Sequence, residues 1–160
     1  MRSLFSAFIA ILMLSACATT YTGPSPDFSK KGGDAFGEYE KFELAKNYGA
    51  LNLYSARMGN QDYYRESVDP IINEISPAST VKLKRMDVAK YANWAIFAAT
   101  MVCIFQPRDT WANSTGYWLG LAGILGTGIY INIQGMGAAE NYNKDLKSKF
   151  TPSLAFSTTF

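Results

Sequence analysis

The sequence contains no histidine, and this absence narrows the chemistry that the chain can support. Histidine is the commonest general base near neutral pH and a frequent metal ligand. Without it, an enzyme would have to use paired carboxylates as acid and base. The acidic candidates lie in polar segments typical of solvated surface: Glu38, Glu40, Glu43, Asp69 and Glu74. The sequence also has no phosphate-binding glycine loop, nucleophile elbow or metal-spaced cluster. It therefore predicts a protein that is not an enzyme and that holds no metal and no cofactor.

Cysteine is scarce as well, and charge is nearly balanced. The two cysteines are Cys17 and Cys103, and Cys103 lies in the apolar run 98–105, where a small packing residue is expected. The net charge of +2 gives no electrostatic basis for binding nucleic acid. A length of 160 residues corresponds to about one domain.

The N-terminus has the pattern of an export signal. Arg2 precedes an apolar run over residues 4–14, and the box Leu14-Ser15-Ala16-Cys17 follows it. Such a segment is too short and wrongly flanked to span a bilayer. The box resembles that of bacterial lipoproteins, in which the cysteine receives a diacylglycerol thioether and cleavage falls just before it. The resemblance implies a signal peptide over residues 1–16 and a mature chain attached to membrane lipid through acylated Cys17. An ordinary signal peptide that happens to contain a cysteine is the alternative.

The next two segments differ in composition. Residues 17–33 are rich in Thr, Ser, Pro and Gly and have no apolar period, which predicts a lipidated, flexible tether. Residues 34–80 predict a small helical segment made of short pieces. The expected pieces are a helix capped by Asp34, a second containing Leu51, Tyr54 and Met58 that ends at Gly59-Asn60, and a third over 71–75 opened by Asp69-Pro70 and closed by Ser76-Pro77. The aromatic side chains of this segment would form either its core or a partner-binding face.

Residues 81–149 predict an antiparallel helical hairpin. Residues 91–107 and 110–139 contain no charge, and Arg108 and Asp109 lie between these runs in a turn-like stretch. The first helix is expected to begin near Ser79 or Thr80. The second is expected to begin near Ser114 or Thr115 and to continue toward Leu146.

Small residues at helical spacing predict that this hairpin lies in lipid. Gly116 and Gly120 have the spacing that allows membrane helices to approach closely, and aromatic residues occur near both ends of the charge-free runs. A buried hairpin inside a soluble oligomer is the alternative. The predicted helix-packing seam comprises Ala92, Ala95, Ala99 and Cys103 on the first helix, and Gly116, Gly120, Gly123 and Thr127 on the second.

The length of the hairpin indicates how deeply it can insert, and its flanking charges indicate which membrane holds it. Residues 91–105 make ~22 Å of helix, which is short for a hydrocarbon layer of ~30 Å and implies thinning, snorkelling by Lys90 or shallow insertion. Seven Lys or Arg residues flank the hairpin ends on the lipid-anchor side, whereas the loop has only Arg108. In an inner membrane this arrangement opposes the positive-inside bias. Ala18 also stands where sorted enterobacterial lipoproteins retained in the inner membrane have aspartate. An outer-membrane position facing the periplasm is therefore favoured.

The C-terminal part carries two further signals. A glycine-rich hairpin followed by Ala138-x-x-x-Tyr142-Asn143 resembles a layout of uncharacterised bacterial envelope proteins, which implies architecture but no activity. Residues 150–160 predict a short strand or tail, because apolar and small polar residues alternate from Pro152 to Phe160. This strand would pair with a partner sheet or a second subunit, or else fray.

The expected fold is mainly α: short periplasmic helices, an antiparallel transmembrane-type helical hairpin and a short C-terminal β-strand. The expected function is that of a non-enzymatic cell-envelope lipoprotein with a structural or interaction role, bound to membrane lipid and to a second copy or another envelope protein. One alternative is a pore or transport accessory built from oligomerised hairpins, lined by Asn93, Asn132 and Gln134. A carboxylate-dependent cell-wall enzyme is the more remote alternative.

Overall fold

The computed structural model describes residues 18–30, 32–45, 54–106 and 110–151. These residues are mainly helical, as the sequence predicts, and they include one small antiparallel sheet, which it does not predict. The chain forms α2 (Gly33–Phe42), β1 (Ser55–Met58), β2 (Gln61–Tyr64), α3 (Arg65–Ile75), α4 (Pro77–Ile104), the π-helical turn η1 (Ala112–Gly116) and α5 (Tyr117–Phe150). The predicted signal peptide, Cys17 and the strand over 152–160 lie outside the described residues.

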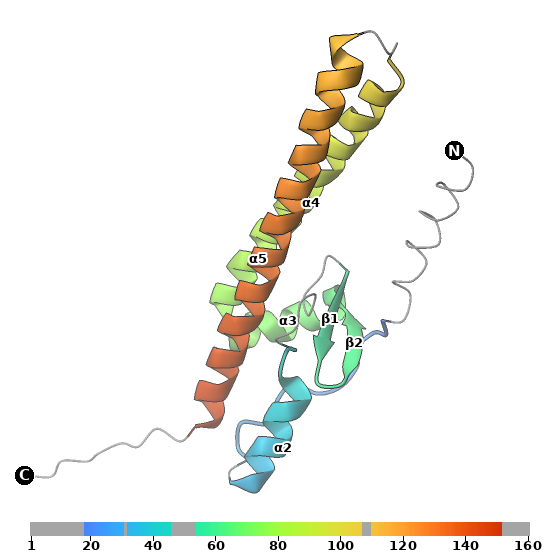
Figure 1. Cartoon of the computed structure of the whole chain (residues 1–160). Helices are drawn as coiled ribbons and strands as arrows, with labels where there is room; N and C mark the ends of the chain where they lie inside the picture. The colour runs from blue at the N-terminus through green and yellow to red at the C-terminus, as the bar shows by residue number, and fades with distance from the viewer. Residues whose placement is uncertain (1–17, 31, 46–53, 107–109, 152–160) are drawn as a thin grey trace, which may run out of the picture.

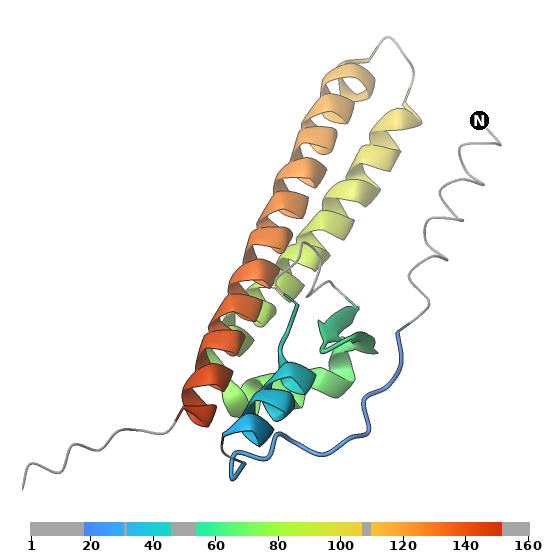
Figure 2. The same cartoon turned by 60° about the horizontal axis from the view of Figure 1, so that its bottom comes forward.

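Helices α4 and α5 form the long antiparallel hairpin that the sequence predicts (Figure 1). Helix α4 begins three residues earlier than a Ser79 cap would place it, because Ser76 is its cap. The Ser76 hydroxyl accepts a hydrogen bond from the Ser79 amide at 3.4 Å, and Pro77 occupies the first helical position. The smaller elements lie beside the lower part of this hairpin in both views (Figures 1 and 2).

The predicted second helix, around Tyr54 and Met58, is wrong. This region forms a β-hairpin in which Ser55 pairs with Tyr64 and Met58 pairs with Gln61. Gly59 has a φ of 58° and takes the first of the two turn positions, where a positive φ favours glycine. Ala56 and Met58 are buried while Arg57 is exposed, so the burial has the period of a strand. Gly59-Asn60 is therefore a strand turn and not a helix end.

Helix α3 begins at Arg65, earlier than the predicted start after Asp69. Val68, Ile71, Ile72 and Ile75 form its buried face at spacings of three and four residues. This apolar face extends across Pro70, which is exposed and lies inside the helix. The packing of that face compensates for the backbone hydrogen bond that a proline cannot donate. The predicted end, before Ser76-Pro77, is correct.

The segment predicted as a flexible tether is packed against the folded part over its described residues. The Thr19 amide donates to the Asp62 carbonyl at 3.0 Å, and the Tyr64 amide donates to the Thr19 carbonyl at 2.8 Å. The Tyr21 ring meets the Tyr63 ring edge-on at 5.2 Å between centroids. Aromatic contacts and strand-like hydrogen bonds hold this Thr- and Pro-rich segment in place, although its composition is typical of a linker.

The buried core lies where the lower part of the α4–α5 hairpin meets α2, α3 and the sheet. Tyr142 and Leu44 are fully buried within it. The Asn143 side chain accepts a hydrogen bond from the Leu44 amide at 2.9 Å and donates one to the Leu44 carbonyl at 2.6 Å. Ala138 is also buried, and its carbonyl accepts a hydrogen bond from the Ser79 hydroxyl at 2.8 Å. The Ala138-x-x-x-Tyr142-Asn143 motif is thus the part of α5 that joins the hairpin to the other elements.

Candidate functional site: an exposed apolar stem

The upper part of the hairpin, here called the apolar stem, comprises residues 91–106 and 110–134. The rest of the described chain is called the base. Among the described residues, every apolar side chain of the buried core belongs to the base. Large apolar side chains of the stem face outward instead. Those at least 60% exposed within α4 and α5 are Tyr91, Val102, Trp118, Leu119, Leu125 and Ile129.

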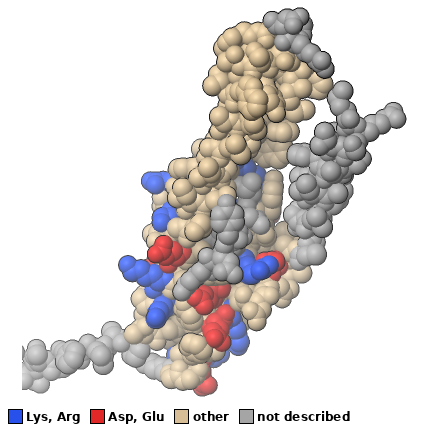
Figure 3. Space-filling view, viewed as in Figure 1, with Lys and Arg blue, Asp and Glu red and all other residues tan. Residues whose placement is uncertain are grey.

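Charge is separated between base and stem. The sequence of the stem contains no Asp, Glu, Lys or Arg. Figure 3 shows the charged side chains gathered around the lower part of the molecule, while the described upper part is free of them on this face. A monomeric soluble protein rarely exposes a contiguous apolar surface of this kind. The stem is therefore the strongest candidate for a functional surface.

Within the stem, glycines of η1 and α5 face side chains of α4. A Cβ atom at Gly116 would lie 2.8 Å from the Cys103 Sγ atom, and one at Gly123 would lie 3.1 Å from Ile96. A Cβ atom at Gly120 would overlap the Thr100 side chain. These glycines leave room for the α4 side chains and allow the two helices to approach closely.

The predicted helix-packing seam is found on its second-helix side but mostly not on its first-helix side. Gly116, Gly120, Gly123 and Thr127 all face α4, and Cys103 faces α5. Ala92, Ala95 and Ala99 are exposed and do not form the seam. The α4 side of the contact is formed by Asn93, Ile96, Thr100 and Cys103. A glycine on one helix accommodates a larger side chain on the other, so a small residue opposite it is not required.

Two asparagines of the stem, Asn93 and Asn132, are hydrogen-bonded inside the hairpin. The Asn93 amide donates to the Thr127 hydroxyl at 2.6 Å and to the Ile124 carbonyl at 3.1 Å. The Asn132 amide donates to the Gly128 carbonyl one turn earlier, at 3.1 Å. Asn93 and Asn132, two of the candidate pore-lining residues, therefore direct their amide groups to neighbouring backbone or side chains.

At the far end of the stem, Asn113 joins η1 to the end of α4. Its amide nitrogen donates to the carbonyls of Gln106 at 3.0 Å and of Cys103 and Ile104 at 3.3 Å. The last carbonyls of a helix lack partners within that helix. An amide supplied from the next turn provides them with partners without water, which is a requirement in an apolar environment. This role of Asn113 was not predicted from the sequence, although an Asn just before the second helix was a usable signal.

Among the described residues, one continuous helical stretch, Asn113–Phe150, is long and apolar enough to cross a membrane. Helix α4 is charged over its first half, and its apolar part within the stem ends at Ile104. That part is ~21 Å long at ~1.5 Å per residue. The two helices of the hairpin therefore differ in apolar length.

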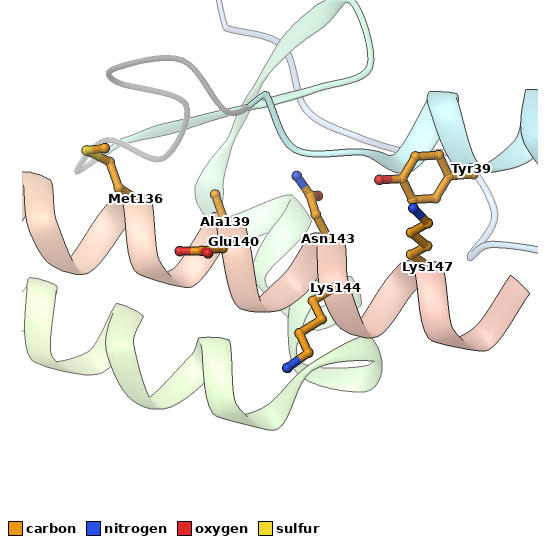
Figure 4. Close-up of a pocket in the computed structure, with 7 residues that line it drawn as sticks. All are labelled: Tyr39, Met136, Ala139, Glu140, Asn143, Lys144 and Lys147. Carbon is orange, nitrogen blue, oxygen red and sulfur yellow. The ribbon is translucent and has the colours of Figure 1, made fainter. Parts of the chain in front are cut away.

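A groove of about 570 Å³ lies in the base, on the side of α5 that faces α2. Figure 4 shows Lys147 extending toward the Tyr39 ring, with Asn143 further along α5. Burial and a 3.0 Å hydrogen bond that it donates to Glu43 raise the pKa of Tyr39 to about 12, so this phenol stays protonated at neutral pH. The groove is lined by Tyr39, Met136, Ala139, Glu140, Asn143, Lys144 and Lys147.

Three of the five acidic residues considered as catalytic candidates are held in separate contacts. Glu38 lies 2.7 Å from Lys30 and 3.5 Å from Lys41, and the hydrogen bond from Lys30 lowers the pKa of its carboxyl. Asp69 pairs with Arg65, and Glu43 accepts the Tyr39 hydroxyl. Across residues 18–30, 32–45, 54–106 and 110–151, no three His, Cys, Asp or Glu side chains are grouped to hold a metal ion.

Comparison of the chain with protein-family models, with curated proteins and with solved structures gives no match.

Proposed function

We propose that this protein is a non-enzymatic lipoprotein of the bacterial cell envelope. In this proposal, acylated Cys17 and the apolar stem hold it in a membrane, and the base projects from that membrane to contact an envelope component or a second copy. The observation that carries the proposal is the stem itself, which is uncharged and exposes large apolar side chains on two helices. Burying such a surface in lipid removes its apolar side chains from water, which is favourable. Because the stem has no charged side chain, no charge has to be desolvated.

The internal polar contacts of the stem support the same proposal. In lipid, every backbone and side-chain polar group requires a partner within the protein. The amide of Asn93 and the carbonyls at the end of α4 have such partners inside the hairpin. A hairpin that was merely solvent-exposed would not require them.

The charges that flank the stem support an outer-membrane position with the base on the periplasmic side. Lys82, Lys84, Arg85 and Lys90 precede the stem, and further lysines follow it near the end of α5. Both ends of the hairpin lie on the anchored side, so insertion into an inner membrane would leave these cations outside. We therefore assign the protein to the periplasmic face of the outer membrane.

Membrane retention without the acyl group tests the role of the stem. We expect residues 18–160, exported behind a cleavable signal without lipidation, to stay with membranes during a carbonate wash. In this background Ile129→Lys should release protein, because a lysine within the hydrocarbon layer costs roughly 2.5–3.5 kcal/mol. Phe36→Lys is the matched control, because Phe36 in the base and Ile129 in the stem are 64% and 62% exposed. A soluble monomer would contradict the proposal, and a soluble oligomer would favour the buried-hairpin alternative.

Acylation of Cys17 is tested separately. We expect Cys17→Ser in the full chain to abolish the incorporation of labelled fatty acid and to block cleavage before residue 17. Normal labelling and maturation of this variant would show that the N-terminal box is not a lipidation signal.

A further inference from the structure

A second groove, of about 470 Å³, lies where the base meets the stem. It is lined by Val81, Lys84, Arg85, Val88 and Ala89 of α4 and by Tyr130 of α5. Val88 is 70% exposed, and Val81 and Tyr130 are also exposed. The groove therefore combines open apolar side chains with two cations.

These two cations differ from the paired cations elsewhere in the base. Arg65 and Arg57 form ion pairs of 2.8–2.9 Å with carboxylates. Lys84 and Arg85 have no ion pair within the described part of the chain, and no carboxylate lines their groove. Asp87, the nearest acidic residue along α4, is paired with Arg65. The groove is thus a site of uncompensated positive charge.

The distance of the groove from the apolar stem, measured along the axis of α4, matches the thickness of a lipid headgroup layer. The charge-free part of α4 begins at Tyr91, and Arg85 lies six residues earlier, or ~9 Å along the helix axis. Polar headgroups add roughly 5–8 Å to each side of a hydrocarbon core. Long Lys and Arg side chains can extend along an apolar surface toward that layer. A hydrocarbon boundary near Tyr91 therefore places both cations within reach of lipid phosphates.

We propose that this groove binds an anionic glycerophospholipid of the leaflet that surrounds the stem. The phosphate pairs with Lys84 and Arg85, and the upper acyl carbons lie against Val88 and Tyr130. This inference rests on the proposed membrane position of the stem. A second copy of the chain fits the groove less well, because a two-fold contact through it would bring the same unpaired cations together. Inorganic phosphate would leave the exposed valines uncovered.

Lipid retention by the full-length lipidated protein tests the inference. The protein is released in mild detergent containing equal amounts of phosphatidylglycerol and phosphatidylcholine, and bound lipid is counted by native mass spectrometry. We expect preferential retention of phosphatidylglycerol. Lys84→Gln with Arg85→Gln should weaken its binding on the order of 20- to 30-fold, at about 1 kcal/mol for each cation. Both side chains are exposed on the surface of α4, so the fold should persist.

Two further variants locate the effect. Lys144→Gln with Lys147→Gln removes the same charge from the other groove and should change binding less than about twofold. Exchanging the two cations, Lys84→Arg with Arg85→Lys, should preserve binding, because both positive charges remain near the lipid phosphate. The inference is overturned by equal retention of the two lipids, by an equal loss in the Lys144/Lys147 variant, by displacement with millimolar inorganic phosphate, or by a dimer that the Lys84/Arg85 variant dissociates.

A carbonate wash of the same proteins separates this inference from the proposed function. Wild type and all three variants should remain in the membrane. If they remain but show no preference for phosphatidylglycerol, the lipid site is wrong and the membrane role stands. If wild type is released from membranes even with its acyl group, the proposed function fails first.

Discussion

The base and the apolar stem use the same two helices but are stabilised in different ways. In the base, large side chains such as Met86, Tyr142 and Leu146 are fully buried against other elements. In the described part of the stem, α4 and α5 pack mainly against each other and the turn η1, and the glycines Gly116, Gly120 and Gly123 lie at their contact. Removal of apolar surface from water stabilises the base. Close packing and internal hydrogen bonds stabilise the stem, whose outer surface remains apolar.

The electrostatic contrast follows the same boundary. The base holds Arg65, which is 6% exposed, between Asp69 and Asp87 at 2.8–3.2 Å and so joins α3 to α4. The stem has no charge to pair. One helical hairpin thus combines a charged half that packs against other elements with an uncharged half whose surface is apolar, without a break in either helix. Four predictions, three of them with a control substitution, test this contrast.

The largest effect is expected from Asn143→Ala in the base. It removes both hydrogen bonds to Leu44 and leaves a buried amide and a buried carbonyl without partners, at about 1–3 kcal/mol each, so that stability should fall by about 3 kcal/mol or more. Thermal unfolding in mild detergent measures the loss. Asn132→Ala in the stem is the control and should cost less than about 1 kcal/mol, because its amide makes one bond to the preceding turn. Equal losses would remove the distinction between base and stem.

In the stem, Gly120→Ala should destabilise the hairpin by about 2–3 kcal/mol, because the added Cβ atom overlaps Thr100. Gly126 lies on the same helix with nothing within 4 Å of an added Cβ atom. Gly126→Ala should therefore stabilise α5 by roughly 0.5–1 kcal/mol. Amide hydrogen exchange over residues 93–104 should accelerate in the first variant only. Protection that is unchanged by both substitutions would show that α4 does not depend on close approach of α5.

Arg65→Met tests the ion pairs of the base. It leaves two carboxylates facing each other without their cation, and a loss of about 2 kcal/mol is expected because both carboxylates keep some contact with water. Arg57 forms an exposed pair with Asp62 at 2.8 Å, so Arg57→Met should cost less than about 1 kcal/mol. Chemical denaturation of both variants provides the comparison. Similar losses would mean that burial of Arg65 adds nothing to its pairing.

Tyr142→Phe should have the smallest effect, and its sign is informative. The Tyr142 hydroxyl is buried and has no hydrogen-bond partner among the described residues, and burial raises the pKa of this phenol. Removing the hydroxyl should leave stability unchanged or raise it by up to about 1 kcal/mol. Thermal unfolding at neutral pH measures the change. A clear loss of stability would reveal a partner for the hydroxyl, such as a bound water.

The predictions from the sequence were wrong in the short segments of the base, where a local pattern suggested a different structure. The alternation of Ala56 and Met58 covers only a four-residue strand, so the spacing from Tyr54 to Met58 suggested a helix instead. Pro70 suggested a helix start, whereas the apolar face from Val68 to Ile75 continues through it. Composition alone suggested a tether where Thr19 and Tyr21 contact the sheet and α3. Each error arose where a long-range contact outweighed a local preference.

The sequence by itself determined the helical hairpin, its charge-free stretch and its glycine-bearing face. Long periodic segments specify helices, and the absence of charge over 91–107 and 110–139 requires no knowledge of neighbours. Only the tertiary structure decided which α4 residues meet those glycines. A rotation of α4 about its axis by one residue replaces one set of facing side chains with the next, here Ala92, Ala95 and Ala99 with Asn93, Ile96 and Thr100. It also decided the role of Asn143, whose partner Leu44 lies 99 residues away in the chain. Contacts between distant segments depend on how the elements pack, and the local period of apolar residues does not specify that packing.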